Sequence, residues 1–190
     1  VSQHKYSDKH IAIAAAIREI DGIIAVWQEP YHGFSSPEAL VKADLVFGFS
    51  PEVADIEKNN GSGVKYFVTI GYIGDYRFDL VRTKSQALRS SLMENGARKI
   101  VTFLDEMTFD DERWGLGHSY IQADYQFILE KVLLEPWLGV ILKPKKPSTL
   151  RKRLGPVSEI LEQAIGTGRC YMYDQDYVTT PAEAAMDSDI

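Results

Sequence analysis

The sequence predicts an α/β fold made of two Rossmann-like β–α–β halves with parallel sheets. Two observations predict it. Short apolar runs that suit buried strands alternate with segments of helical spacing, and this alternation occurs on both sides of residues 71–97. Parallel strands joined by right-handed crossovers form open sheets that bind ligands at the carboxyl ends of their strands. The loops that follow strands are therefore where we expect functional residues.

The first half is predicted from three apolar runs and three helical segments. The predicted strands are 23–27, 45–49 and 64–70. The predicted helices are 10–20, 37–41 and 51–59. The last helix has the clearest start, because Ser50 suits a capping position and Pro51 suits the first helical position. The glycine-containing segment 71–79 then breaks the pattern and suits a hinge.

The second half repeats the alternation. Its predicted strands are 99–104, 138–142 and 169–173, and its predicted helices are 84–94, 118–134, 154–165 and 181–186. We divide the chain accordingly into residues 1–80, a linker helix over 81–97, and residues 98–190. We expect the chain to be a truncated piece of a larger protein, because it lacks an initiator Met and Ile190 should enter a further strand.

Composition argues against several classes of protein. The net charge is -6, with 21 Lys and Arg against 27 Asp and Glu, so nucleic acid is not expected as a partner. No apolar run approaches the roughly 18 residues that a transmembrane helix needs, which leaves only peripheral membrane contact open. The single cysteine, Cys170, fits a cytoplasmic protein, and we expect it to be a buried apolar residue. No zinc-type spacing is present, so no metal site is expected.

The most distinctive segment is the lysine–proline string 142–147, which follows a predicted strand. It carries Lys143, Lys145 and Lys146, and Arg151 comes shortly after it. Cations at the carboxyl end of a strand, next to the start of a helix, suit a phosphate group. The alternative interpretation is a solvated, lysine-rich loop.

Carboxylates follow the strand 99–104. Asp105 and Glu106 suit a general base, a sugar-hydroxyl acceptor or magnesium ligands. The alternative is a polar loop that caps the next helix. Trp114 in the same loop suits stacking on a ring or covering the core. In the first half, Glu29 and His32 form a further acid–base candidate pair, although a single loop histidine is more often structural.

Several of these segments resemble bacterial surface-polysaccharide biosynthesis proteins. The segments that carry the resemblance are 99–104, the Asp-Asp-Glu-Arg-Trp-Gly loop 110–115, 136–147 and 150–156. Such proteins are similar to glycosyltransferases of the two-Rossmann GT-B type, and more distantly to CDP-glycerol glycerophosphotransferases and UDP-N-acetylglucosamine 2-epimerases. Segment 68–79 is similar to their Gly-x-Pro-x-x-Asp string at the domain junction. Lys145 and Ile73 depart from the pattern, where those proteins have His and Pro.

The resemblance implies glycosyl transfer from a nucleotide sugar in surface-polysaccharide biosynthesis. It makes residues 1–80 part of an acceptor-side domain and 98–190 the first half of a nucleotide-sugar domain. The nucleotide sugar and a carbohydrate acceptor are substrates, and no cofactor is implied. The implied donor-binding residues are Lys143, Lys145, Lys146, Arg151 and Trp114. The implied candidates for deprotonating the acceptor are His32, Glu29, Asp105 and Glu106.

Two alternatives to glycosyl transfer stay open. A nucleotide-sugar 2-epimerase or a glycerophosphate-type transferase would keep the fold and change the reaction. A non-catalytic domain would use the lysines to bind an anionic polymer or a protein partner. We expect the chain by itself to be inactive in either enzymatic case, because half of the implied donor site would lie beyond Ile190.

Overall fold

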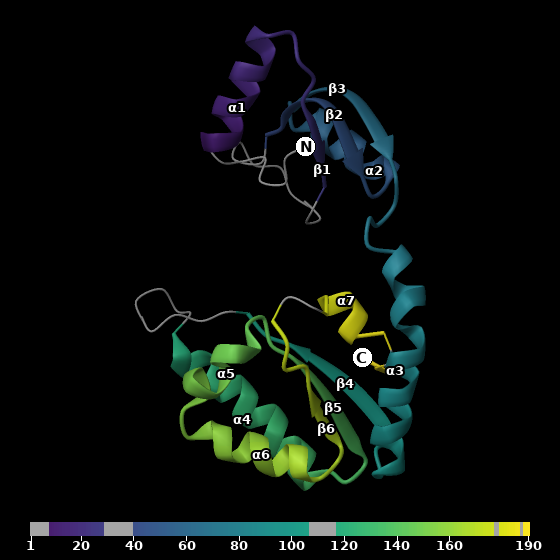
Figure 1. Ribbon diagram of the computed structural model, residues 1–190, viewed down its shortest axis with the longest axis vertical. Coiled ribbons are helices and arrows are strands. Elements are labelled where there is room, and N and C mark those ends of the chain that lie inside the picture. Colours follow the sequence, from purple (N-terminus) through teal and green to yellow (C-terminus); the bar gives the residue numbers. More distant parts are fainter. Residues whose placement is uncertain (1–7, 29–39, 107–116, 177–178, 187) are drawn as a thin grey trace. The chain divides into compact units, whose positions relative to one another are not determined.

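The computed structural model describes residues 8–28, 40–106, 117–176, 179–186 and 188–190. The chain divides into two compact units, Val1–Tyr76 and Arg77–Ile190. Each unit contains a three-stranded parallel sheet with helices packed against it (Figure 1). The predicted fold class, α/β with two Rossmann-like halves, is therefore confirmed.

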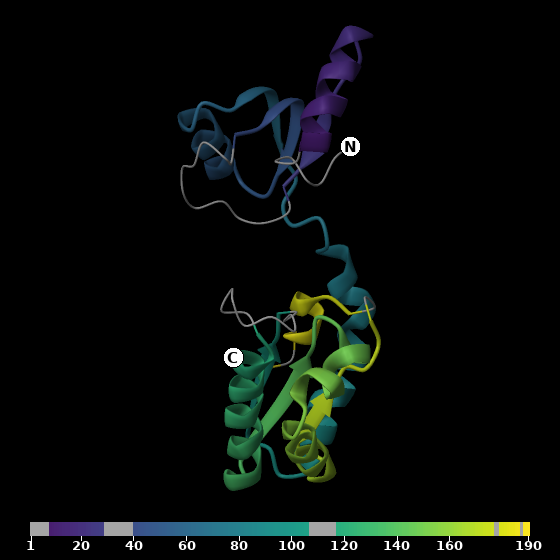
Figure 2. The same cartoon turned by 90° about the vertical axis from the view of Figure 1, so that its left-hand side faces the viewer.

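The first unit has the strand order β1-β2-β3. Its elements are α1 (Asp8–Glu19), β1 (Ala25–Trp27), β2 (Lys42–Gly48), α2 (Pro51–Asn59) and β3 (Gly63–Thr69). Figures 1 and 2 show α1 and α2 on opposite sides of the sheet. Small and β-branched side chains from α1 and the strands form its core, with Val26, Val41 and Ala43 fully buried. Of the predicted helix 37–41, residues 40 and 41 are not helical and the rest lie outside the described residues.

The second unit has the strand order β4-β5-β6. Its elements are α3 (Tyr76–Glu94), β4 (Lys99–Leu104), α4 (His118–Leu134), β5 (Leu138–Lys143), α5 (Pro147–Leu154), α6 (Val157–Gly166), β6 (Cys170–Met172) and α7 (Pro181–Ala184). Successive side chains of β5 point to opposite faces of the sheet, as they do along any strand. Val140 and Leu142 pack with α4, α5 and α6, whereas Ile141 packs with the α3 and α7 side. Figure 1 shows these two helical layers with the sheet between them.

The largest departures from the predicted helices are at α5 and at the start of α3. The sequence predicts one helix over 154–165 after the lysine–proline string, but Pro147 opens α5, and Gly155 separates α5 from α6 with a φ of 54° that favours glycine. Helix α3 begins at Tyr76 rather than at 84. Its first turn is held by an ion pair between Arg77 and Glu183, a residue that also completes the capping box of α7.

The end of the described chain lies beside β4. The Asp189 N–H donates to the Ile100 carbonyl at 2.7 Å, and the Thr102 N–H donates to the Ile190 carbonyl at 2.9 Å. The Ile100 carbonyl and the Thr102 N–H point away from β5, because the backbone groups of a strand alternate between its two edges. Residues 189–190 therefore lie on the edge of β4 opposite β5. The strands that follow β4 in the sequence, β5 and β6, lie on one side of it, and residues 189–190 lie on its other side.

Candidate functional site

The carboxyl ends of β4, β5 and β6 bring three loops of the second unit together. Asp105 and Glu106 follow β4, the lysine–proline turn 144–146 follows β5, and Asp176 lies in the loop after β6. Hydrogen bonds join the first loop to the second and the third loop to the start of α5. The sequence-predicted carboxylates and lysines therefore do meet at one edge of the sheet.

Asp105 is a buried anchor for the lysine–proline turn. Its side chain is fully buried and accepts hydrogen bonds from Arg153 Nη2 at 3.2 Å, from the Tyr125 hydroxyl at 3.2 Å and from the Lys145 backbone N–H. Burial and the neighbouring Asp105 carboxylate raise the pKa of Tyr125, so its hydroxyl stays a donor. Three donors on one enclosed carboxylate give Asp105 a positioning role. Its predicted role as a general base stays a prediction.

Arg153 completes this buried network from the last turn of α5. Its side chain is 4% exposed, and Nη1 makes a long 3.5 Å contact with the Glu106 carbonyl oxygen. Its Nε is buried and has no hydrogen-bond partner among the residues that the structure describes. The Asp105 carboxylate therefore supplies most of the charge compensation for the Arg153 guanidinium. A buried cation without such a partner is strongly unfavourable.

The predicted cations separate into different environments. Lys143 is buried, and its ammonium group donates to the Pro144 carbonyl at 2.8 Å. Lys145 is exposed and pairs with Glu106 at 2.6 Å. Arg151 pairs with Glu162 of α6 at 2.8 Å, with both side chains more than half exposed. Lys146 is half-buried at the N-cap of α5.

The amino end of α5 already holds a carboxylate. Asp176 accepts hydrogen bonds from the Ser148 backbone N–H at 3.1 Å and from the Ser148 hydroxyl at 2.6 Å. These bonds lower the pKa of Asp176, and the positive charges of Lys146 and Lys143 lower it further. The donors that hold this carboxylate come from Ser148, and the anion site that the sequence predicts at the lysines stays a prediction.

Sequence reasoning missed four residues of this edge: Tyr125, Ser148, Arg153 and Asp176. Asp176 lies in a loop that the fold rule marks as functional, and Ser148 follows the proline that opens α5. Those two could have been found from position. The Asp105 contacts with Tyr125 and Arg153 join residues 20 and 48 positions apart, and no local pattern encodes them.

Three predicted site residues, Glu29, His32 and Trp114, lie outside the described residues. Within the described ranges, no group of three His, Cys, Asp or Glu side chains is placed to hold a metal ion. The same ranges contain no helix that is both long and apolar enough to cross a bilayer.

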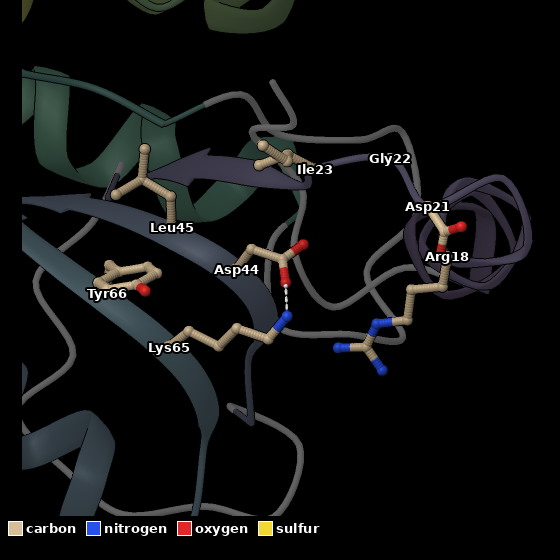
Figure 3. Close-up of a pocket in the computed structure, with 8 residues that line it drawn as sticks. All are labelled: Arg18, Asp21, Gly22, Ile23, Asp44, Leu45, Lys65 and Tyr66. Atoms are coloured by element: carbon tan, nitrogen blue, oxygen red, sulfur yellow. Dashed lines mark ion pairs between the residues drawn. The ribbon is translucent and has the colours of Figure 1, made fainter.

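The first unit has an open depression of about 700 Å³ near the amino ends of its strands. Figure 3 shows Asp44 and Lys65 pointing toward each other there, with an ion-pair distance of 2.7 Å. The Ile24 N–H also donates to Asp44, at 2.9 Å, and this bond and the Lys65 contact lower the pKa of Asp44. The pair joins β2 to β3 and to the start of β1. Ligands of parallel sheets bind at the opposite, carboxyl ends, so this depression is not taken as the candidate site.

No family model, curated protein or solved structure matches this chain. The likeness to polysaccharide biosynthesis proteins therefore stays a prediction from the sequence.

Proposed function

We propose that the second unit binds the diphosphate of a nucleotide sugar at the carboxyl edge of β4-β5-β6, and that the protein serves glycosyl transfer in surface-polysaccharide biosynthesis. The observation that supports this proposal best is the Asp176 carboxylate held at the amino end of α5 by Ser148. In the proposal, a phosphate group of the donor takes the place of that carboxylate.

A phosphate suits this position for two reasons. The first turn of a helix has unpaired N–H groups and a partial positive charge, which favour an anion. Lys143 and Lys146 lie close enough to lower the pKa of the carboxylate now bound there. A diphosphate carries more negative charge than a carboxylate and therefore gains more from the same cations.

The proposed chemistry is electrostatic. As the bond between sugar and diphosphate breaks, negative charge grows on the leaving phosphate, and preorganised cations and N–H groups stabilise it. The buried Asp105–Arg153 pair keeps the turn in place, since Asp105 binds the Lys145 backbone N–H. Among the described carboxylate candidates, Glu106 is the one with an exposed side chain, at 80%, and it can reach an acceptor hydroxyl.

Calorimetric titration with a panel of nucleotide diphosphates and nucleotide sugars tests the proposal. Asp176→Asn removes the competing charge, so we expect it to bind a diphosphate about 3–10-fold more tightly than the unchanged chain. Ser148→Ala should weaken binding. Glu162→Gln, which removes a carboxylate from the Arg151 pair instead, is the matched control and should change affinity little.

Failure of every common nucleotide sugar and diphosphate to bind either the unchanged chain or Asp176→Asn would contradict the proposal. Binding followed by epimerised or glycerophosphate-containing products, rather than a new glycosidic bond, would keep the site and change the reaction. Product analysis with a carbohydrate acceptor separates these outcomes.

A further inference from the structure

Helix α4 carries an apolar stripe on the side that faces away from the core. Tyr120, Phe127 and Leu134 are 60%, 63% and 73% exposed. They are spaced by seven residues, so they lie nearly in line along one face of the helix. The core face of α4 is complete without them, because Ile121, Tyr125, Leu129 and Val132 fill it.

The stripe is more than scattered surface hydrophobicity. Three large exposed side chains lie in line over a 17-residue helix, and aligned exposed apolar side chains mark interaction sites more often than single ones do. The Phe127 ring is approached by Lys131 of the same helix, whose ammonium group lies 5.9 Å from the ring centre. That contact leaves the ring largely open to water.

The charges beside the stripe define how a partner helix fits. Helical spacing puts Asp124 and Lys131 on one flank and Ala123 and Glu130 on the other. We infer that α4 pairs antiparallel with α4 of a second copy of this chain, about a two-fold axis at Phe127. In that arrangement Asp124 lies opposite Lys131 of the second copy, and the symmetry makes this pair twice.

The same arrangement matches the remaining side chains by size. Tyr120 lies opposite Leu134 of the second copy, and the small Ala123 faces the longer Glu130. A parallel pairing would instead place Lys131 opposite Glu130 of the second copy and leave Asp124 opposite Ala123, although Glu130 already accepts a hydrogen bond from Gln126 at 2.7 Å. In the antiparallel orientation Asp124 and Lys131 both gain a partner of opposite charge, and Glu130 keeps its bond with Gln126.

The surface area that the stripe can bury is small compared with that of stable complexes. Fully buried aromatic side chains remove about 150–250 Å² each from water, so covering the exposed parts of these three removes roughly 350 Å² per copy. Stable complexes bury about 800 Å² per partner. We therefore expect a weak, reversible dimer rather than a permanent one.

Sedimentation velocity of the whole chain from about 5 to about 500 µM tests this inference. The average mass should rise from the 21.4 kDa of one chain toward twice that value. Phe127→Asp should abolish the rise. Leu80→Asp on α3, where the side chain is 76% exposed, is the matched control and should leave the rise unchanged. Circular dichroism of each variant checks that the helices stay formed.

A charge exchange tests the orientation. Asp124→Lys and Lys131→Asp should each weaken the dimer about tenfold, and the double variant D124K/K131D should restore it, because the two pairs are rebuilt with their signs reversed. A chain that stays monomeric at the highest concentration overturns the inference. The inference is also overturned if Leu80→Asp abolishes the rise in mass as Phe127→Asp does. It is overturned as well if the double variant dimerises no more strongly than the single variants. The inference does not depend on the proposed ligand, so the two proposals fail separately.

Discussion

Replacing Asp105 with alanine tests whether the buried network holds the lysine–proline turn. The variant leaves the Arg153 guanidinium, which is 4% exposed and has an unpartnered Nε, without its carboxylate. Breaking a buried ion pair by removing one partner costs about 3–5 kcal/mol. The Tyr125 hydroxyl and the Lys145 N–H also lose their acceptor, so we expect the free energy of unfolding of the second unit to fall by about 4 kcal/mol.

Hydrogen exchange of the β5 amides in increasing urea measures this loss in the second unit alone. Glu106→Gln is the control, because its side chain is 80% exposed and its pair with Lys145 should contribute less than about 1 kcal/mol. The double variant D105A/R153M should recover more than half of the loss, since no buried charge is left unpaired. A loss below about 1 kcal/mol in Asp105→Ala would refute the reasoning.

Two further variants test other contacts of the second unit. Gly139→Ala would place a methyl group 2.8 Å from the Ala97 Cβ, so thermal unfolding should show a loss of about 1–3 kcal/mol; an unchanged melting temperature would contradict the packing. Burial raises the pKa of Glu183, but the Thr180 N–H and Arg77 lower it more, and it lies below the ordinary 4.5. The stabilisation is therefore present above about pH 4.5 and is lost as the pH falls through the lowered pKa. Melting curves at pH 7 and pH 3.5 should show Glu183→Gln less stable at pH 7 and less sensitive to acid, and equal acid sensitivity would argue against the Arg77 contact.

Local pattern accounts for most of the fold. Strand 99–104 and helix 118–134 agree with the structure at both ends, because each is a periodic apolar segment between clear breaks. The start of α3 could not be read this way. Its first turn depends on Arg77 meeting Glu183, a residue 106 positions later in the chain.

In the candidate site, too, the position of a segment could be predicted from the sequence, but the contacts of its side chains could not. The lysine–proline turn was recognisable from its place after a strand, and the structure puts it at the carboxyl edge. What each side chain does there depends on distant partners. Lys143 donates to the Pro144 carbonyl, and Asp105 accepts from Arg153 and Tyr125, so both residues make structural contacts that the sequence did not predict.

The central claim is that the amino end of α5 receives a phosphate-bearing ligand. Two-dimensional NMR of the ¹⁵N-labelled chain, titrated with pyrophosphate and then with a uridine or cytidine diphosphate, tests it most directly. We expect the largest amide shifts at Ser148 and Asp176, because the ligand displaces the carboxylate that now occupies the Ser148 N–H. Shifts confined to other surfaces, or an unchanged Ser148 amide at saturating ligand, would contradict the account.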